Sequence, residues 1–258
     1  MIKRYIPVDS TVLLTPSFAD ADALTDLVED FLSQVPSFTP RHWGWVEPTS
    51  LELSLPEIRA LLNENGSPDI TWKRKSEPKG WGVFHKRRYP PIGPQLAGHG
   101  LEVSADKAAQ VEELINYLRH LVVQYGVEYA FCDSNTDDYR RIGFANGFAP
   151  TADNLMVFTH MLVKRLPDIL WGQVFGPAYV RLFGLEKLLS APAYKVEQLG
   201  PESVYIQLSE SLFDMHDRYA EVDAVRQQVK QHLDDNIFFD ARNLEGHVYR
   251  TPVFAFPE

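Results

Sequence analysis

The sequence predicts an α+β fold, in which helices pack on one face of a mainly antiparallel sheet. Three observations support this class: an apolar fraction of 45%, segments whose apolar residues recur every three or four positions, and short segments of alternating character between them. The apolar fraction is ample for a packed core. A chain of 258 residues is consistent with one domain, 1–258, or with two related βαβ-type halves, 1–150 and 151–258.

Five segments have the periodicity or the end signals of helices. The clearest is 105–124, where apolar residues keep helical spacing, Ser104 is placed to cap the start and Gly126 to end the helix. Another begins at Pro177, which suits a first helical turn, and ends at or beyond Gly184. The remaining three helices are expected at 20–34, 55–63 and 219–233.

Strands are expected between these helices. The segments 70–75 and 83–88 flank the turn-rich segment 77–80, and we predict that they form a hairpin. The remaining predicted strands are 11–15, 43–46, 127–132, 155–163, 193–199, 204–208 and 237–240.

Composition and charge restrict the compartment and the partners. Cys132 is the single cysteine, so neither an internal disulfide nor a thiolate metal site can form. The first residues lack the apolar run of a signal peptide, and no segment approaches the roughly 20 apolar residues of a membrane helix. The net charge of −10 argues against nonspecific binding to nucleic acid or anionic membranes. We therefore expect a cytoplasmic protein, with the oligomeric state left open.

No sequence motif for catalysis or cofactor binding is present. The patterns GxxxxGK[ST], GxGxxG and GxSxG are missing, and the eight histidines include no HExxH or HxxxH pair. The segment 133–138 resembles the start of a calcium loop, but Asp138 and Phe144 stand where Gly and Glu are required. We predict no metal, no cofactor and no enzymatic activity. A hydrolase that joins Asp133, Asp137 or Asp138 to a histidine only in the folded chain stays open as an alternative.

Two charged segments are candidate contact surfaces. The first, the basic hairpin 72–89, carries seven Lys or Arg residues against Glu77 alone, interleaved with aromatic residues that suit charge and stacking contacts with a polyanion. A nucleic-acid-binding module is therefore a further alternative, although the acidic chain as a whole disfavours it. The candidate contact residues of the basic hairpin are Trp72, Lys73, Arg74, Trp81, Arg87 and Arg88.

The second candidate surface is acidic and lies around the start of the helix 219–233. Acidic residues are favoured at a helix N-terminus by the helix dipole, and an exposed group of them also suits a basic protein partner. This acidic ridge consists of Glu210, Asp214, Asp217, Glu221 and Asp223.

One segment carries a resemblance to a known family. Within residues 168–208, a short segment with Trp171 leads into Gly176-Pro177, then a short helix that ends near Gly184, and then two strands. This order resembles the C-terminal part of bacterial immunity proteins of type VI secretion and polymorphic-toxin systems, of the DUF3396 (TsiV-like) or Imm52-like families. Trp43-Gly44-Trp45 is similar to a glycine–aromatic step of these families.

The resemblance implies a cytoplasmic, non-enzymatic protein that binds and neutralises a cognate secreted toxin. It identifies no contact residues, because cognate surfaces differ from one pair to the next. Charge adds a direction: a basic toxin would meet the acidic ridge, and an acidic toxin would meet the basic hairpin.

Overall fold

An antiparallel sheet of ten strands runs through the computed structural model, which describes residues 4–14, 21–45, 48–65, 69–85, 96–138, 157, 162–239 and 248–254. The strand order is β3-β2-β4-β5-β6-β1-β7-β8-β10-β9, so strands of both predicted halves share one sheet. The strands are β1 (Ile6–Leu14), β2 (His42–Gly44), β3 (Leu51–Glu52), β4 (Asp69–Arg74), β5 (Gly80–His85), β6 (Ala97–Ala105), β7 (Val127–Asp133), β8 (Gly172–Phe175), β9 (Lys195–Gly200) and β10 (Ser203–Gln207).

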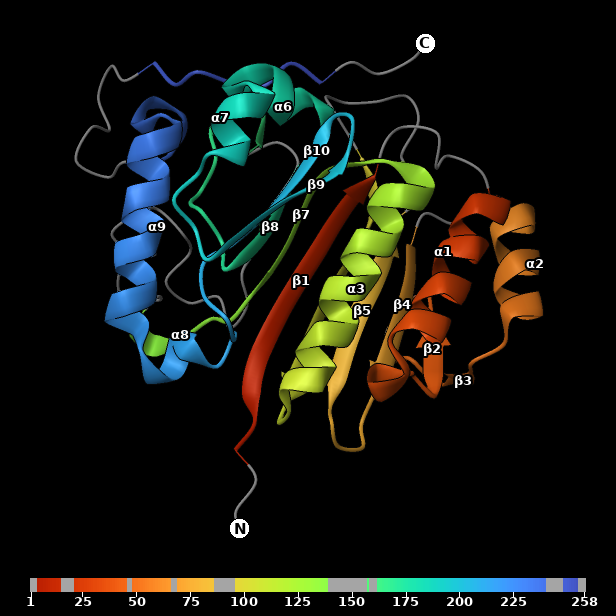
Figure 1. Ribbon diagram of the computed structural model, residues 1–258. Coiled ribbons are helices and arrows are strands. Elements are labelled where there is room, and N and C mark those ends of the chain that lie inside the picture. Colours follow the sequence, from red (N-terminus) through yellow and green to blue (C-terminus); the bar gives the residue numbers. More distant parts are fainter. Residues whose placement is uncertain are drawn as a thin grey trace.

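The predicted helices are all present in the structure. In Figure 1, α1 and α2 lie at one end of the molecule, α3 crosses in front of β5, and α9 lies at the other end. Within the described part of the chain, no helix is both long and apolar enough to cross a membrane. The helices are α1 (Ala21–Gln34), α2 (Leu55–Asn65), α3 (Ala108–Tyr125), α6 (Pro177–Phe183), α7 (Leu185–Leu189), α8 (Asp214–Asp217) and α9 (Tyr219–Leu233).

Helix α3 ends as predicted but begins differently. Gly126 ends the helix with a φ of 74°, a conformation that glycine adopts without strain. The start is at Lys107 instead of Ser104, because Ser104 still belongs to β6. The Gln110 side chain accepts hydrogen bonds from the backbone N–H groups of Asp106 and Lys107 and so satisfies free donors before the first turn.

Helices cover both faces of the sheet. A Cβ on Gly172 would stand 3.3 Å from Ile115, so this position of β8 faces α3. Phe175, three residues further along β8, packs against Tyr179 of α6 with ring centroids 5.7 Å apart. Because successive side chains of a strand point to opposite faces, α3 and α6 lie on opposite sides of β8. The α+β class and the antiparallel sheet are confirmed, whereas the helices, predicted on one face, are divided between two.

The strand predictions are confirmed in most places and wrong in a few. The predicted hairpin exists, with β4 and β5 paired from Asp69↔His85 to Arg74↔Gly80. Strands β3, β6 and β8 were not predicted, because β6 is broken by glycines and the other two are only two and four residues long. The predicted strand 237–240 is instead the end of a 3-10 helix, Asp235–Ile237, followed by Phe238 in an isolated bridge. Most of the predicted strand 155–163 lies outside the described residues.

A series of connected hydrogen bonds, a polar chain of side chains, crosses the aromatic core between the sheet and helices α1 and α3. Trp72 Nε1 donates to His99 Nε2 over 3.0 Å, and His99 Nδ1 lies 3.1 Å from the hydroxyl of Tyr117. The rings of Phe84 and His99 stack at 3.8 Å between centroids, and Phe31 meets His99 edge-on. Each polar atom of this chain therefore has a partner inside an otherwise apolar region, as buried polar groups require.

Candidate functional site

One row of side chains crosses seven neighbouring strands on a single face of the sheet. Paired residues of antiparallel neighbours point to the same face, so the row follows from the strand registers alone. At one end the side chains are exposed or half-buried, and at the other end Asp9 and Asp133 are buried. In strand order the row is Glu52, His42, Lys73, Trp81, Glu102, Asp9 and Asp133. We call its first five members the Trp81 row.

Within the Trp81 row, Trp81 stands between an acid, Glu102, and a base, Lys73. Its side chain is 40% exposed although it belongs to a regular strand. The indole Nε1 donates to Glu102 Oε2 over 3.3 Å, and Lys73 stands opposite Trp81 on β4. A large apolar ring, a carboxylate and an ammonium group are thus presented side by side to solvent.

Two predicted contact residues of the basic hairpin do not belong to a free surface. Trp72 is 1% exposed and lies in the core, so it cannot contact a partner, contrary to its selection from the sequence. Arg74 donates to the carbonyl oxygens of Pro78 and Thr39, both over 2.9 Å, and so stabilises the hairpin turn. Lys73 and Trp81 are accessible. Arg87 and Arg88 lie outside the described residues.

The acidic ridge is largely neutralised by the protein's own arginines. Arg218 lies 2.9 Å from Asp214 and 3.3 Å from Glu221, each measured between side-chain nitrogen and oxygen. The other two pairs are Arg4 with Asp217 at 2.5 Å and Arg226 with Asp223 at 2.9 Å. Four of the five acids are therefore already paired, and Asp214 is also buried. The ridge presents much less negative charge than its sequence indicates.

Beneath α9 the structure brings together four charged groups, of which three are buried and the fourth, Lys230, is largely covered. The Arg226 side chain is 0% exposed, and its Nε donates to the carbonyl oxygen of Ile169 over 2.8 Å. One turn later in the helix, Lys230 Nζ lies 3.0 Å from Asp168 Oδ1. Asp133, at the end of β7, is fully buried and is influenced by the charge of Arg226. We call Asp133, Asp168, Arg226 and Lys230 the buried charge cluster.

Asp133 has the most informative electrostatics of this cluster. Burial raises the pKa of its carboxyl group to about 6, although Arg226 and the N–H groups of Ser134 and Trp171 act in the opposite direction. Those two N–H groups donate to Oδ1 over 2.6 Å and to Oδ2 over 3.1 Å. A shifted carboxyl beside other titratable groups is a common property of active sites, and also of structural ion-pair networks.

A serine and a histidine meet beside Asp133, although the hydrolase alternative named only an aspartate and a histidine. Ser134 Oγ lies 2.8 Å from His216 Nε2, but it also lies 2.5 Å from the carbonyl oxygen of Pro7. A carbonyl oxygen only accepts, so Ser134 gives its single proton to Pro7 and His216 Nε2 must donate to Oγ. A nucleophile needs the reverse arrangement, in which the serine donates to the histidine. The pair therefore has the polarity of a structural contact.

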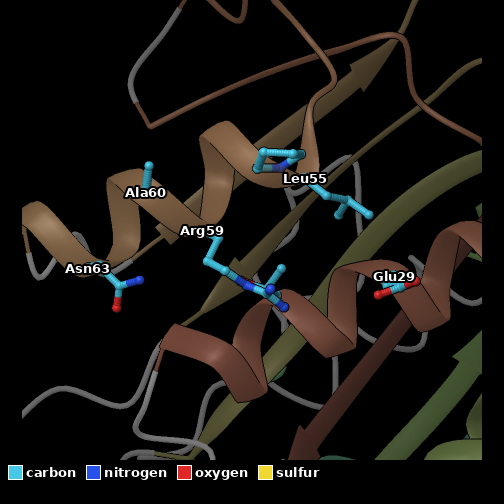
Figure 2. A pocket seen from close by; sticks show the side chains of 7 residues that line it. Glu29, Leu55, Arg59, Ala60 and Asn63 are labelled. Atoms are coloured by element: carbon cyan, nitrogen blue, oxygen red, sulfur yellow. The ribbon is translucent and has the colours of Figure 1, made fainter.

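A shallow cavity of about 410 Å³ lies between α1 and α2. Figure 2 shows Arg59 reaching from α2 toward α1, where its Nε lies 3.3 Å from Asp22. The rest of the lining is mostly small or apolar, including Leu55 and Ala60. Among the residues that the structure describes, no three His, Cys, Asp or Glu side chains gather in a way that could hold a metal ion.

Comparisons with known proteins show a fold and no family. No family model and no curated protein matches the chain, so membership of the DUF3396 or Imm52-like families stays a prediction. The fold is similar to that of the Pseudomonas aeruginosa T6SS protein PA0821, with a TM-score of 0.53 and 15% identity, over 87% of this chain and 73% of that chain.

A second solved structure matches more weakly. It is the toxic C-terminal tip of CdiA from Pseudomonas aeruginosa in complex with immune protein, at a TM-score of 0.30 and 10% identity, over 52% of this chain and 90% of that chain. This TM-score is too low to indicate a common fold. What the comparisons show is that the α+β architecture of this chain is similar, over most of its length, to that of a T6SS protein.

Proposed function

We propose that the chain is a cytoplasmic immunity protein that binds a cognate secreted bacterial toxin and neutralises it without chemistry of its own. The observation that carries the proposal is the fold similarity to a T6SS protein across 87% of the chain. It agrees with the independent resemblance of residues 168–208 to immunity proteins of type VI secretion and polymorphic-toxin systems. A sequence pattern and an overall fold thus indicate the same biological setting.

The arrangement of side chains supports binding over catalysis. The exposed Trp81, flanked by Lys73 and Glu102, has the composition of a protein contact, where aromatic and charged residues lie together. The serine–histidine pair, by contrast, is polarised in the wrong direction for a nucleophile. The buried charge cluster is likewise occupied by contacts between α9, the end of β7 and the segment before β8.

Co-expression tests the proposal. If an adjacent reading frame encodes a secreted protein with a toxin domain, that domain is expressed in a bacterial host from an inducible promoter, with and without this protein. We expect growth to be restored by the protein, and a catalytically inactivated toxin domain to co-purify with it. Toxicity that persists at equal expression, together with no complex, would overturn the proposed function.

Two variants separate neutralisation by binding from neutralisation by hydrolysis. Ser134→Ala removes the hydroxyl that a hydrolase would use, and His216→Gln keeps a donor to Oγ but removes the imidazole. If the protein acts by binding alone, both variants restore growth as the wild type does. Loss of rescue in both variants, with complex formation unchanged, would instead favour the hydrolase.

A further inference from the structure

We infer that the Trp81 row is the surface that contacts the toxin, and that it receives an arginine or lysine side chain of the toxin between Trp81 and Glu102. This inference rests on the proposed function and adds to it the location of the contact and the chemistry of the partner. It departs from both surfaces chosen from the sequence, because the acidic ridge is internally paired and the basic hairpin supplies only part of the row.

The exposed ring of Trp81 is the first reason. Solvated apolar rings are common singly on protein surfaces, but this one lies within a regular strand and is held in place by its hydrogen bond to Glu102. The face of an indole attracts a cation more strongly than any other side-chain ring. An aromatic ring that is restrained by a hydrogen bond loses less conformational freedom on binding than an unrestrained one, so it suits an interface anchor.

The charge of Glu102 is the second reason. Glu102 accepts the Trp81 N–H, and among the described residues no Lys or Arg lies within ion-pair distance of it. The carboxylate of Glu102 therefore makes the potential beside Trp81 negative on this side, which attracts a basic side chain and repels a phosphate.

Lys73 gives the contact a direction. It lies on the opposite side of Trp81 from Glu102, with His42 beyond it. A toxin surface that places its cation near Glu102 would gain further from an acidic group near Lys73, and the reversed placement would bring like charges together. The row thus favours one orientation of a mixed-charge protein surface over a uniformly anionic polymer.

The comparison with the acidic ridge is the third reason. Its acids are held by Arg218, Arg4 and Arg226, so a basic toxin would have to displace these arginines before pairing with them. Glu102 needs no such displacement. A toxin cation can therefore pair with Glu102 in the Trp81 row at a lower cost than with the acids of the acidic ridge.

The test measures the Kd of the inactivated toxin domain by isothermal titration calorimetry, for the wild type and four variants. Trp81→Ala removes the ring, and Glu102→Gln removes the charge while its amide oxygen still accepts the Trp81 N–H. Trp45→Ala and Glu221→Gln are matched controls. Trp45 is another exposed tryptophan, 47% exposed and directly after β2, and Glu221 is an acid of the acidic ridge. We expect the first two to raise Kd by about tenfold or more, as interface anchors do, and the controls by less than about twofold.

Each outcome decides the inference. Glu102→Gln keeps the hydrogen-bonding pattern of the folded sheet, so weaker binding by this variant at an unchanged Tm supports a direct charge contact. Unchanged Kd values for Trp81→Ala and Glu102→Gln, with a wild type that binds, overturn the inference and leave the proposed function intact. A wild type that does not bind the toxin overturns both.

Two other occupants would also overturn the inference. The first is nucleic acid, revealed if a fluorescein-labelled single-stranded oligonucleotide binds the wild type at low salt and Trp81→Ala abolishes that binding. The second is another copy of this chain, revealed if light scattering shows a dimer that Trp81→Ala separates into monomers.

Discussion

Lys230 Nζ and Asp168 Oδ1 form an ion pair of 3.0 Å beneath helix α9, with the carboxyl group almost fully buried. The pair joins the helix to the segment that leads into β8. Arg226, one turn earlier, joins the same helix to Ile169, the residue after Asp168. A helix with limited apolar character is thus attached to the sheet through desolvated charges, which makes its attachment sensitive to single substitutions.

Removal of the Arg226 charge should destabilise the fold strongly. In Arg226→Met the Ile169 carbonyl loses its donor, and Asp133 and Asp223 lose a neighbouring positive charge. Breaking a buried pair from one side typically costs about 3–5 kcal/mol of unfolding free energy. Arg218→Met is the control, since the Arg218 side chain is exposed and solvent screens its ion pairs, so the loss should be much smaller. Urea denaturation measures the unfolding free energy of both variants. Equal losses would contradict the conclusion that buried charges attach α9 to the sheet.

Asp133 should make stability depend on pH in a definite direction. Its pKa of about 6 in the folded protein exceeds its ordinary value of 3.8, so folding takes up a proton between these values. The carboxyl group therefore costs stability as the pH rises from about 4 to about 6, by roughly 3 kcal/mol in total. Relative to Asp133→Asn, wild-type stability should fall between about pH 4 and 7. Urea denaturation at several pH values measures it, and a constant difference would contradict the assignment.

His99 should stay neutral and carry its proton on Nδ1. Trp72 Nε1 can only donate, so His99 Nε2 must accept, which leaves Nδ1–H to donate to Tyr117. Burial, and after it the charge of His85, holds the pKa of His99 well below 6.5. Nitrogen-15 NMR should show one neutral tautomer with no titration between about pH 5 and 8. A midpoint near 6.5, the value of an unperturbed histidine, would contradict the burial of this polar chain.

The unfolded chain, unlike the folded one, can protonate His99 as the pH falls through about 6.5. The stabilising contribution of this position is therefore present above that pH and is lost below it. The pH ranges in which His99 and Asp133 act overlap, and the Asp133→Asn comparison cancels the effect of His99 because both proteins carry this histidine.

A side chain at position 176 should disrupt the start of α6. A Cβ on Gly176 would collide with the carbonyl oxygen of Val127 and stand 2.7 Å from the Cα of Glu128. Gly176→Ala should therefore cost about 3 kcal/mol or more, as overpacking against backbone does. At Gly200 a Cβ meets nothing within 4 Å, so Gly200→Ala should leave Tm nearly unchanged. Similar Tm values for the two variants would contradict the packing of α6 on β7.

The sequence predicted elements with strong local signals and missed those defined by their neighbours. Helix α3 was predicted because its apolar residues keep helical spacing and Gly126 stands where such a helix would end. Strand β6 was not, because His99 and its flanking glycines do not resemble a strand until they pair with β1 and β5. The division of helices between two faces follows from β8 and β10, which are buried on both sides.

The candidate site was predicted only in part. Lys73 and Trp81 were selected from the sequence and lie in the Trp81 row. Glu102 and His42 were not, because only the strand registers bring them beside Trp81. Trp72 was selected for the same reasons as Trp81, but residues on opposite faces of a hairpin have opposite exposure, and the sequence alone did not reveal which face is buried. The arginines that neutralise the acidic ridge also became evident only in the folded chain.

The most direct test of the central claim is the stoichiometry of the interaction with active toxin. Titration of the toxin domain with the purified protein, followed by toxin activity, should show inhibition that is complete at one protein per toxin and a toxin that stays intact. Inhibition far below equimolar protein, with the toxin cleaved or chemically altered, would show turnover and contradict neutralisation by binding. Full toxin activity in excess protein would contradict the immunity function altogether.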